Sequence, residues 1–397
     1  MSPRTTTPPW PLVALFTAGY LAAYLLPTTV GRLDAALPLT TTEAGAVGSA
    51  LLLGSATAGF TLAAHVARLG PRRLARAGLL LAAAGYGTAA LTTALPAVVA
   101  GAVLGGFGSG TATAVAATGI AAQRDPHRVS TTGLLSVSAL AGALYLTLPR
   151  LGPGHGLPLA ALALTALLTL PATARLAAPV ATAQVARERG PLPHPRHGLT
   201  LAVTLLLWSL AQNSLWGVSG RIGTTQAGLS EVTVGAVFAA ALGAGLLGVI
   251  GASALGVRFG RALPIGVGTA LISGCIALSA TATDLTSFAT GEIAWNALYP
   301  VVLSYLIGLA ASLDPRGRWA VLIGSASSLG TAAGPLVGSL LSAHVGYPAM
   351  GAILAVGLLL ITAPMTWVAL LTATPTTERA RYEEQATAGR PEYRPAA

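Results

Sequence analysis

Long apolar stretches recur along this chain of 397 residues, with few charged side chains between them. Hydrophobic residues make up 53% of the chain and charged residues 9%, whereas a soluble domain carries about 25% charge. So few charges cannot cover a surface that faces water. A stretch of about 18 or more apolar residues is long enough to cross about 30 Å of hydrocarbon as a helix. The sequence therefore predicts an all-α membrane protein.

Twelve apolar stretches are expected to form membrane helices, at 11–31, 43–67, 74–94, 96–122, 129–149, 157–175, 199–220, 231–257, 263–282, 286–311, 319–343 and 348–371. A connector rich in Pro, Arg and His covers 176–198, and a polar tail of mixed charge covers 372–397. The predicted organisation is a six-helix half over 1–175, the connector, a second six-helix half over 199–371, and the tail.

Two short motifs occur twice, about half a chain apart. The run Arg68-Leu69-Gly70-Pro71-Arg72 reappears as Arg258-Phe259-Gly260-Arg261, and Asp125-Pro126-His127-Arg128 reappears as Asp314-Pro315-Arg316. The two offsets are 190 and 189 residues. A shared offset near half the chain length indicates two copies of one unit. Repeated halves of apolar helices are typical of membrane transporters.

The arginines predict the orientation of the chain. With the N-terminus inside, nineteen of the 22 arginines fall on the inner face, and the outer face holds Arg32, Arg150 and Arg221. The positive-inside rule then predicts cytoplasmic N- and C-termini. There is no lysine, and with the abundant Ala, Gly and Pro we interpret this as the bias of a GC-rich bacterial genome. The net charge of +10 is explained by topology, so no nucleic-acid partner is predicted.

The arginine loops resemble the signature loop of the major facilitator superfamily, which has the form Gly-x-x-x-Asp-Arg-x-Gly-Arg-Arg between helices 2 and 3. Ala67 and Val257 stand at the position of the acid. The resemblance covers residues 1 to about 371 and implies a twelve-helix transporter similar to bacterial proton-coupled drug or metabolite transporters. It implies an inner gate at the positions that match in the two loops, Arg68, Gly70, Arg72, Arg258, Gly260 and Arg261. The alternative is that these arginines only anchor the topology.

A second motif of the superfamily lies at an unexpected position. Antiporters often carry Gly-x-x-x-Gly-Pro-x-x-Gly on helix 5, whereas this chain carries it from Gly330 to Gly338, on the expected helix 11. The pattern predicts close helix packing and a proline bend. Its absence from helix 5 weakens the likeness to a typical drug antiporter.

One acidic residue, Glu292, lies about six residues inside an expected membrane helix. A carboxylate in hydrocarbon costs several kcal/mol, so such a residue normally faces a cavity and is functional. Loss of hydration favours the protonated form of a carboxyl, which can then exchange a proton near neutral pH. We predict Glu292 as the proton-coupling residue. The alternatives are hydration near the outer surface or a pair with an outer arginine.

Polar and aromatic side chains form stripes on the expected helices 1, 7 and 10. By the resemblance, helices 1, 4, 7 and 10 line the central pathway. The predicted substrate-binding residues are therefore Tyr20, Tyr24, Gln212, Asn213, Trp216, Trp295, Asn296 and Tyr299. The alternative is that the aromatic rings serve packing or anchor the chain at the membrane interface.

Arg32 and Arg221 stand at the outer ends of helices 1 and 7, which the repeat relates to each other. Together with Asp34 they are predicted to form an outer gate. The two arginines would pair with Asp34, Glu231, Asp284 or Glu292 to close the outer side, or they would attract an anionic substrate. The alternative is that they are snorkelling anchors. Glu43 follows three threonines and Glu231 follows Ser230, a pattern that fits N-capping of the expected helices 2 and 8.

The sequence thus predicts a secondary transporter that works by alternating access in the inner membrane of a bacterium, as a monomer embedded in lipid. The substrate is a small neutral or cationic organic molecule, coupled to protons, with efflux favoured over uptake. A non-transporting sensor is a further alternative. The single cysteine, Cys275, and histidines without metal-ligand spacing predict no metal site. No cofactor and no enzymatic activity are predicted, because Glu292 has no catalytic partner at its depth.

Overall fold

The computed structural model describes residues 9–176, 191–256, 258–314 and 316–372, and these contain helices and turns but no strand. Residues 373–397 of the predicted tail (372–397) and residues 177–190 of the predicted connector (176–198) lie outside the described residues.

The helices fall into two groups along the chain. The first group contains α1 (Trp10–Tyr24), α2 (Leu26–Ala36), α3 (Thr41–Leu62), η1 (Ala63–His65), α4 (Val66–Leu69), α5 (Pro71–Leu91), α6 (Leu95–Ala121), α7 (Pro126–Leu151), α8 (Gly156–Thr169) and η2 (Leu170–Arg175). The second contains α9 (Pro195–Arg221), η3 (Ile222–Gln226), α10 (Glu231–Leu255), α11 (Ala262–Ala280), α12 (Leu285–Ser312) and α13 (Arg318–Leu371).

The spans in the described part of the chain are consistent with the twelve predicted. Ten helical stretches are long and apolar enough to cross a membrane, and α1 with α2 forms one more span, bent by 47°. The 54-residue α13 contains two helices, because Gly346 has φ 77° and ψ 165°, outside the helical region. A straight helix of that length would extend about 81 Å, far more than the thickness of a bilayer.

Two predicted boundaries are wrong, and proline explains both. The span predicted as one helix over 11–31 breaks at Leu25 and continues to Ala36, with Pro27 in the first turn of α2. The predicted connector ends early, because α9 begins at Pro195 instead of at 199. Proline lacks the backbone N–H that an interior helical position needs, but it fits the first turn of a new helix.

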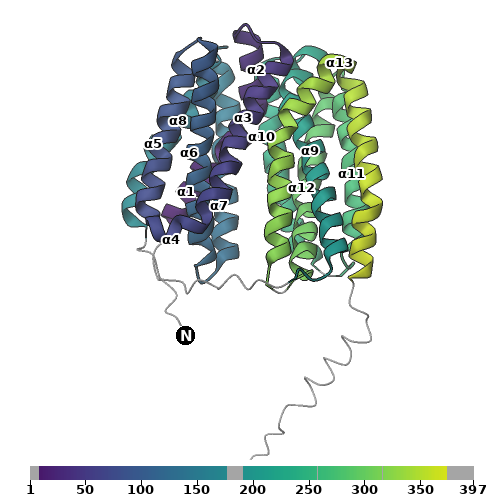
Figure 1. Cartoon of the computed structure of the whole chain (residues 1–397). Coiled ribbons are helices and arrows are strands. Elements are labelled where there is room, and N and C mark those ends of the chain that lie inside the picture. Colours follow the sequence, from purple (N-terminus) through teal and green to yellow (C-terminus); the bar gives the residue numbers. More distant parts are fainter. Residues whose placement is uncertain (1–8, 177–190, 257, 315, 373–397) are drawn as a thin grey trace, which may run out of the picture.

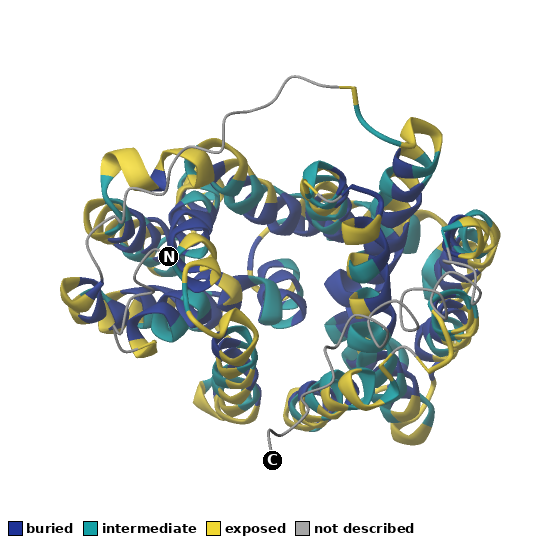
Figure 2. Cartoon of the chain, turned by 90° about the horizontal axis from the view of Figure 1, so that it is seen from below, coloured by how far each residue is buried: buried dark blue, intermediate teal, exposed yellow. Residues whose placement is uncertain are grey.

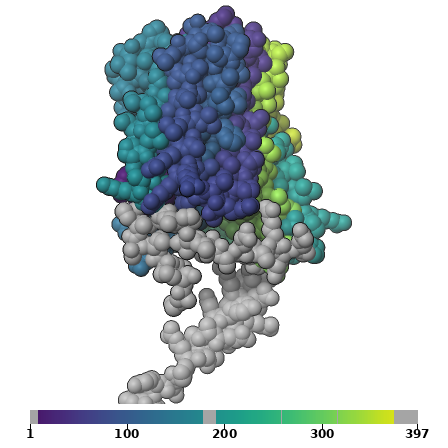
Figure 3. Space-filling view, turned by 60° about the vertical axis from the view of Figure 1, so that its left-hand side comes forward, coloured from purple at the N-terminus to yellow at the C-terminus, as the bar shows by residue number. Residues whose placement is uncertain are grey.

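The two groups stand side by side as two halves of the molecule (Figure 1). Viewed along the spans, buried residues face the interior of each half, and exposed residues gather around the rim (Figure 2). The face turned forward in Figure 3 is formed mainly by the N-terminal half, with the C-terminal half behind it. Leucines point outward on most spans, as a surface in contact with lipid requires.

The starts of α1 and α9 and the end of α13 lie at the lower end of the bundle in Figure 1, which we name the terminal end. The opposite end, where α2 leads into α3 and η3 leads into α10, is named the loop end. Both described ends of the chain are thus on one side, as an even number of spans requires.

The glycine motif of α13 packs directly against α9. A Cβ atom at Gly330 would come within 2.1 Å of the Leu206 carbonyl oxygen, and one at Gly338 within 2.1 Å of the Ser214 carbonyl oxygen. At Gly334 it would meet the side chain of Asn213 at 2.5 Å. The close packing predicted for this motif is therefore confirmed, and it joins two helices of the same half.

Candidate functional site

At the loop end, Arg32 of α2 reaches from the N-terminal half to the C-terminal half. Its Nη2 donates to Glu231 Oε2 of α10 at 2.8 Å. The same guanidinium donates to the carbonyl oxygens of Leu148, at 3.1 Å, and Gly154, at 3.3 Å. Arg32 is 3% exposed, whereas the Glu231 side chain is 43% exposed. The buried cation is therefore matched by three acceptors, one of them charged.

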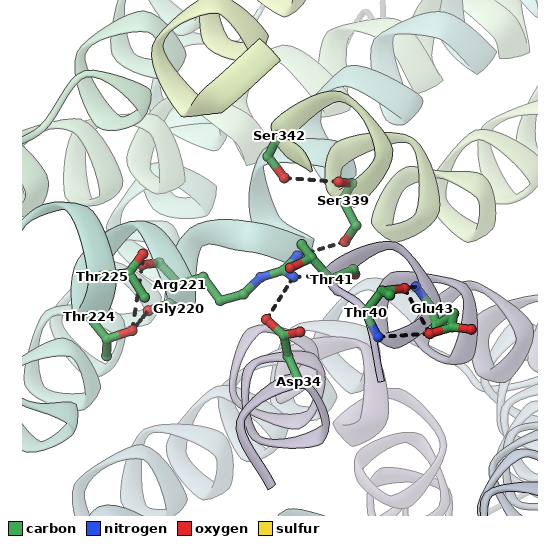
Figure 4. Close-up of polar contacts among 10 residues, drawn as sticks. All are labelled: Asp34, Thr40, Thr41, Glu43, Gly220, Arg221, Thr224, Thr225, Ser339 and Ser342. Atoms are coloured by element: carbon green, nitrogen blue, oxygen red, sulfur yellow. Dashed lines mark hydrogen bonds and ion pairs between the residues drawn. The ribbon is translucent and has the colours of Figure 1, made fainter. Parts of the chain in front are cut away.

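Arg221, the last residue of α9, makes the reverse connection (Figure 4). Its Nη1 donates to Asp34 Oδ2 of α2 at 3.2 Å and to the carbonyl oxygen of Thr41 at 3.3 Å. Its Nη2 donates to Ser339 Oγ of α13 at 2.6 Å. Figure 4 shows the side chain extending between Asp34, Thr41 and Ser339. Both arginines thus join the two halves, one from each half.

We name Arg32, Glu231, Arg221 and Asp34 the loop-end latch. The sequence predicted Arg32, Asp34 and Arg221 together and considered Glu231 as one of four possible partners. The predicted N-cap at Ser230 and Glu231 is confirmed, because Ser230 is the N-cap and Glu231 is the first residue of α10. Ser230 caps α10 by accepting a hydrogen bond from the Thr233 N–H at 3.1 Å, which leaves the Glu231 carboxylate free to bind Arg32.

At the predicted cap near Glu43, Thr40 and Glu43 each accept a hydrogen bond from the other's backbone N–H. Thr40 is the N-cap of α3 and accepts from the Glu43 N–H at 3.2 Å. The Glu43 carboxylate in turn accepts from the Thr40 N–H at 2.7 Å. This capping box stabilises the start of α3 beside the latch.

Close packing between the halves surrounds the latch. Gly45 of α3 faces α13 so closely that a Cβ atom would lie 2.2 Å from Ser339 Oγ and 2.6 Å from the Pro335 carbonyl oxygen. The backbone N–H of Leu336 donates to Ser49 Oγ across the same contact at 2.9 Å. On the other side, a Cβ atom at Gly235 of α10 would meet the Tyr145 carbonyl oxygen at 2.2 Å.

Glu292 of α12 is fully buried in the C-terminal half, with 0% exposure. Its Oε1 accepts hydrogen bonds from Ser219 Oγ of α9 at 2.8 Å and from Ser279 Oγ of α11 at 2.5 Å. Its Oε2 is buried and has no hydrogen-bond partner among the described residues. No ion pair joins it to a basic side chain in the described ranges. Neither alternative, surface hydration or pairing with an outer arginine, is seen here.

Aromatic rings connect the region of Glu292 to both halves. The rings of Trp216 and Trp295 lie 5.7 Å apart, and Phe238 lies 5.2 Å from Trp216 and 5.1 Å from Tyr145 of α7. Tyr145 is buried. Its hydroxyl donates to the Tyr24 carbonyl oxygen of α1 at 2.5 Å. The ring contacts thus connect Tyr145 of the N-terminal half to Trp295, which lies one turn from Glu292 on α12.

Several predicted substrate-binding residues are committed to partners inside the protein. Trp295 Nε1 donates to Gln212 Oε1, and Trp216 Nε1 donates to the Ala23 carbonyl oxygen at 3.0 Å. Asn213 donates toward Thr331 Oγ1 of α13 at 3.3 Å, and Asn296 donates to the Glu292 carbonyl oxygen at 2.9 Å. The first three bonds join α9 to α12, α1 and α13, whereas the Asn296 bond lies within α12.

Three predicted tyrosines form a more accessible group. Tyr20 is 39% exposed, and Tyr24 and Tyr299 are half-buried. Tyr20 and Tyr24 belong to α1 and Tyr299 to α12, so the group draws on both halves.

The two arginine loops at the terminal end keep to their own halves. Arg72 Nε donates to the Leu176 carbonyl oxygen at 2.6 Å, and Arg261 Nη1 donates to Ser312 Oγ at 2.7 Å. Arg68 and Arg258 are exposed. Gly70 and Gly260 have positive φ values of 86° and 65°, so the repeat extends to the backbone. The inner gate remains a prediction.

Two acidic residues outside the spans, Asp284 and Asp314, accept hydrogen bonds at the starts of α12 and α13. The backbone N–H of Ser287 donates to the Asp284 carboxylate at 2.9 Å and lowers its pKa. The Arg318 guanidinium donates to Asp314 Oδ2 at 2.7 Å and lowers the pKa of that carboxyl. Both groups are held ionised, which distinguishes them from Glu292.

Sequence reasoning missed Ser219 and Ser279, the partners of Glu292, and it missed Tyr145. Serines are common in this chain, and these two differ in no local pattern from their neighbours. Only the packing of α9, α11 and α12 brings them to the acid.

The chain resembles known proteins in structure and not in sequence. No protein-family model matches the sequence, and no curated protein matches it. The human organic anion transporter MFSD10 (TETRAN) matches in structure with a TM-score of 0.66 and 18% identity, over 90% of this chain and 99% of that chain.

A point mutant of the nucleoside transporter NupG matches with a TM-score of 0.70 and 13% identity, over 92% of this chain and all of that chain. A bacterial homologue of the human lysosomal transporter Spinster, inward-facing and unoccupied, matches with a TM-score of 0.66 and 14% identity. This match extends over 92% of this chain and 94% of the Spinster homologue. At these identities the likeness concerns the fold.

Proposed function

We propose that this chain, which has the fold of major facilitator superfamily transporters, moves a small organic molecule across the cytoplasmic membrane of a bacterium by alternating access coupled to protons. The substrate is a neutral or cationic aromatic molecule, and the direction is efflux. Uptake of a nutrient or metabolite by the same cycle is the second candidate.

The latch supports alternating access. It joins the halves at the loop end, while Arg72 and Arg261 at the terminal end bind only within their own halves. The described conformation is therefore one that is closed at the loop end. With cytoplasmic termini, as the arginine distribution predicts, this is the inward-facing state.

The burial of Glu292 without a cation is the observation that carries the proton coupling. Its Oε1 has two serine hydroxyls and its Oε2 has no partner in the described residues. A buried charge is costly unless it is paired, so this site favours the neutral acid when it is closed from water. A group that is neutral when buried and ionised when hydrated carries one proton per cycle.

The substrate class follows from the side chains where the halves meet. Tyr20, Tyr24 and Tyr299 offer aromatic faces and hydroxyls. Aromatic faces attract cations and planar rings. The two membrane arginines, Arg32 and Arg221, are occupied by the latch, which leaves them unsuited to bind an anion in this conformation.

The test uses purified protein in proteoliposomes with an imposed pH gradient and a panel of fluorescent cationic, neutral and anionic aromatic dyes. We expect gradient-driven movement of cationic or neutral dyes. Glu292→Gln should abolish this movement while dye exchange without a gradient continues, because glutamine cannot carry a proton. Asp284→Asn, at the start of the same helix, is the control and should behave like the unaltered protein.

Gradient-driven transport that survives in Glu292→Gln would refute the coupling role. Movement of anionic dyes alone would refute the proposed substrate class. The sign of the gradient that drives accumulation distinguishes efflux from uptake.

A further inference from the structure

The two oxygens of Glu292 have different surroundings. Oε1 accepts from two hydroxyls, at 2.8 Å from Ser219 Oγ and 2.5 Å from Ser279 Oγ. Oε2 is equally buried but has no partner among the described residues. One oxygen therefore already accepts two hydrogen bonds, whereas the other accepts none, so the two oxygens differ in how readily they bind a proton.

The site is built by three helices that approach closely. Ser219 comes from α9, Ser279 from α11, and the acid from α12. Gly291 precedes the acid and permits this approach, because a Cβ atom there would lie 2.8 Å from the Ser279 backbone nitrogen. Both serines are fully buried, with 0% exposure. Ser219 Oγ also lies 3.0 Å from the Leu215 carbonyl oxygen of its own helix, so Glu292 Oε1, at 2.8 Å, is the nearer of its two acceptors.

We propose that Ser219 and Ser279 are positioning residues, here named the serine clamp, which hold Oε1 of Glu292 and leave Oε2 as the atom that binds the proton. This inference rests on the proposed function of Glu292 as the proton carrier. Hydroxyls that donate to a carboxylate stabilise its ionised form, and hydrogen bonds to an ionised acceptor are roughly twice as strong as those between neutral groups. The clamp thus favours release of the proton.

The clamp also links the acid to the latch. Ser219 lies two residues before Arg221 on α9, so both occupy the last turn of that helix. The π-helical segment η3 follows, and Gln226 Nε2 donates to the carbonyl oxygens of Ala280, at 2.8 Å, and Ala282, at 2.9 Å. Ala280 directly follows Ser279. Each clamp serine therefore stands on a segment that the loop end holds in place.

A change in the proton on Glu292 consequently changes how firmly α12 holds the last turn of α9. The hydroxyls of Ser219 and Ser279 bind Oε1 more strongly when the acid is ionised than when it is protonated. The clamp thus ties the protonation state of Glu292 to the packing of α12 against α9 and α11.

The test measures protonation of Glu292 directly and without substrate. Infrared spectra of the purified full chain over a pH series record the C=O stretch of protonated carboxyls, and the band lost in Glu292→Gln belongs to this acid. Ser219→Ala and Ser279→Ala should each move the titration midpoint of that band to higher pH by about one unit, the amount expected for loss of one hydrogen bond to a charged group. Ser279→Thr keeps the hydroxyl and should restore the original midpoint.

Two serines on the same helices serve as matched controls. Ser214 of α9 and Ser273 of α11 are buried and have no bond to Glu292, since Ser273 Oγ donates to the Thr269 carbonyl oxygen at 2.9 Å. Ser214→Ala and Ser273→Ala should leave the midpoint unchanged. The pH profile of dye transport in proteoliposomes should shift in the clamp variants and not in the controls.

The outcomes separate the two proposals. An unmoved band in both clamp variants, with a band that Glu292→Gln removes, would overturn the clamp and leave the proton carrier intact. A spectrum without any band that depends on Glu292 would overturn both. A normal midpoint in the clamp variants together with lost coupling in Glu292→Gln supports the proposed function alone.

Discussion

Arg32, Arg221 and Glu292 are buried ionisable residues in a membrane protein, and their partners differ in kind. Each arginine meets a carboxylate and further oxygen acceptors, so its charge is compensated. Glu292 meets only hydroxyls. A compensated cation stays charged and serves structure, whereas an uncompensated acid can exchange its proton. This contrast supports the proposal that Glu292, and not the latch arginines, carries the coupled proton.

Gly45→Ala should disrupt the contact behind Arg221. The new Cβ atom would meet Ser339 Oγ at 2.2 Å and the Pro335 carbonyl oxygen at 2.6 Å, and backbone atoms cannot move aside easily. We expect a loss of about 1–3 kcal/mol from overpacking, seen as a lower Tm in detergent. Gly59→Ala on the same helix has nothing within 4 Å and should keep or raise the Tm. An equal Tm in both variants would contradict the close contact.

At the scale of helices, the breaks in the spans decide where side chains point. The bend of 47° between α1 and α2 carries Arg32 and Asp34 toward the C-terminal half. At the equivalent place in the second half, α9 passes into the π-helical η3 directly after Arg221. Irregular helix ends thus accompany both latch arginines, and π segments are often found at functional sites.

The break in α13 depends on Gly346, whose φ of 77° lies in the left-handed region. Gly346→Ala should strain the backbone by about 1–2 kcal/mol and lower the Tm of the purified protein. Gly357→Ala, in the second helix of α13, has open space around the new methyl and should be neutral or slightly stabilising. A neutral Gly346→Ala would show that the two helices do not need this turn.

At the scale of the whole molecule, the two halves are joined by reciprocal ion pairs and by close helix contacts near the loop end. Arg32 extends from the first half to Glu231, and Arg221 from the second half to Asp34. Such pairs are weak when hydrated and strong when closed from water. The latch therefore stabilises the closed loop end without preventing it from opening.

Arg221→Ala should shift the molecule toward an open loop end. The reporter is Ser49→Cys in a Cys275→Ala background, because Ser49 is 8% exposed and contacts Leu336 of the other half. Losing one partner of a buried pair costs about 3–5 kcal/mol, so we expect at least about tenfold faster labelling by a membrane-impermeant maleimide. Arg150→Ala removes an exposed arginine at the same end and should leave the labelling rate unchanged. Slower or equal labelling in Arg221→Ala would contradict the latch.

The sequence alone determined the class of the protein, because hydrocarbon thickness sets the length of each span and the cost of charge makes every membrane acid conspicuous. The apolar spans and the singular position of Glu292 follow from local composition, and the repeat follows from the offset of the two loop motifs. The latch arginines were also visible, since the offset of the repeat relates Arg32 to the neighbourhood of Arg221.

Tertiary structure decided the partners. Arg32 and Glu231 are 199 residues apart, Ser219 and Glu292 are 73 apart, and no local spacing relates either pair. The sequence also suggested tryptophan and amide side chains as substrate contacts, but packing turned several of them toward one another. Pairing across helices depends on how whole spans rotate and tilt, which a periodic pattern within one span does not encode.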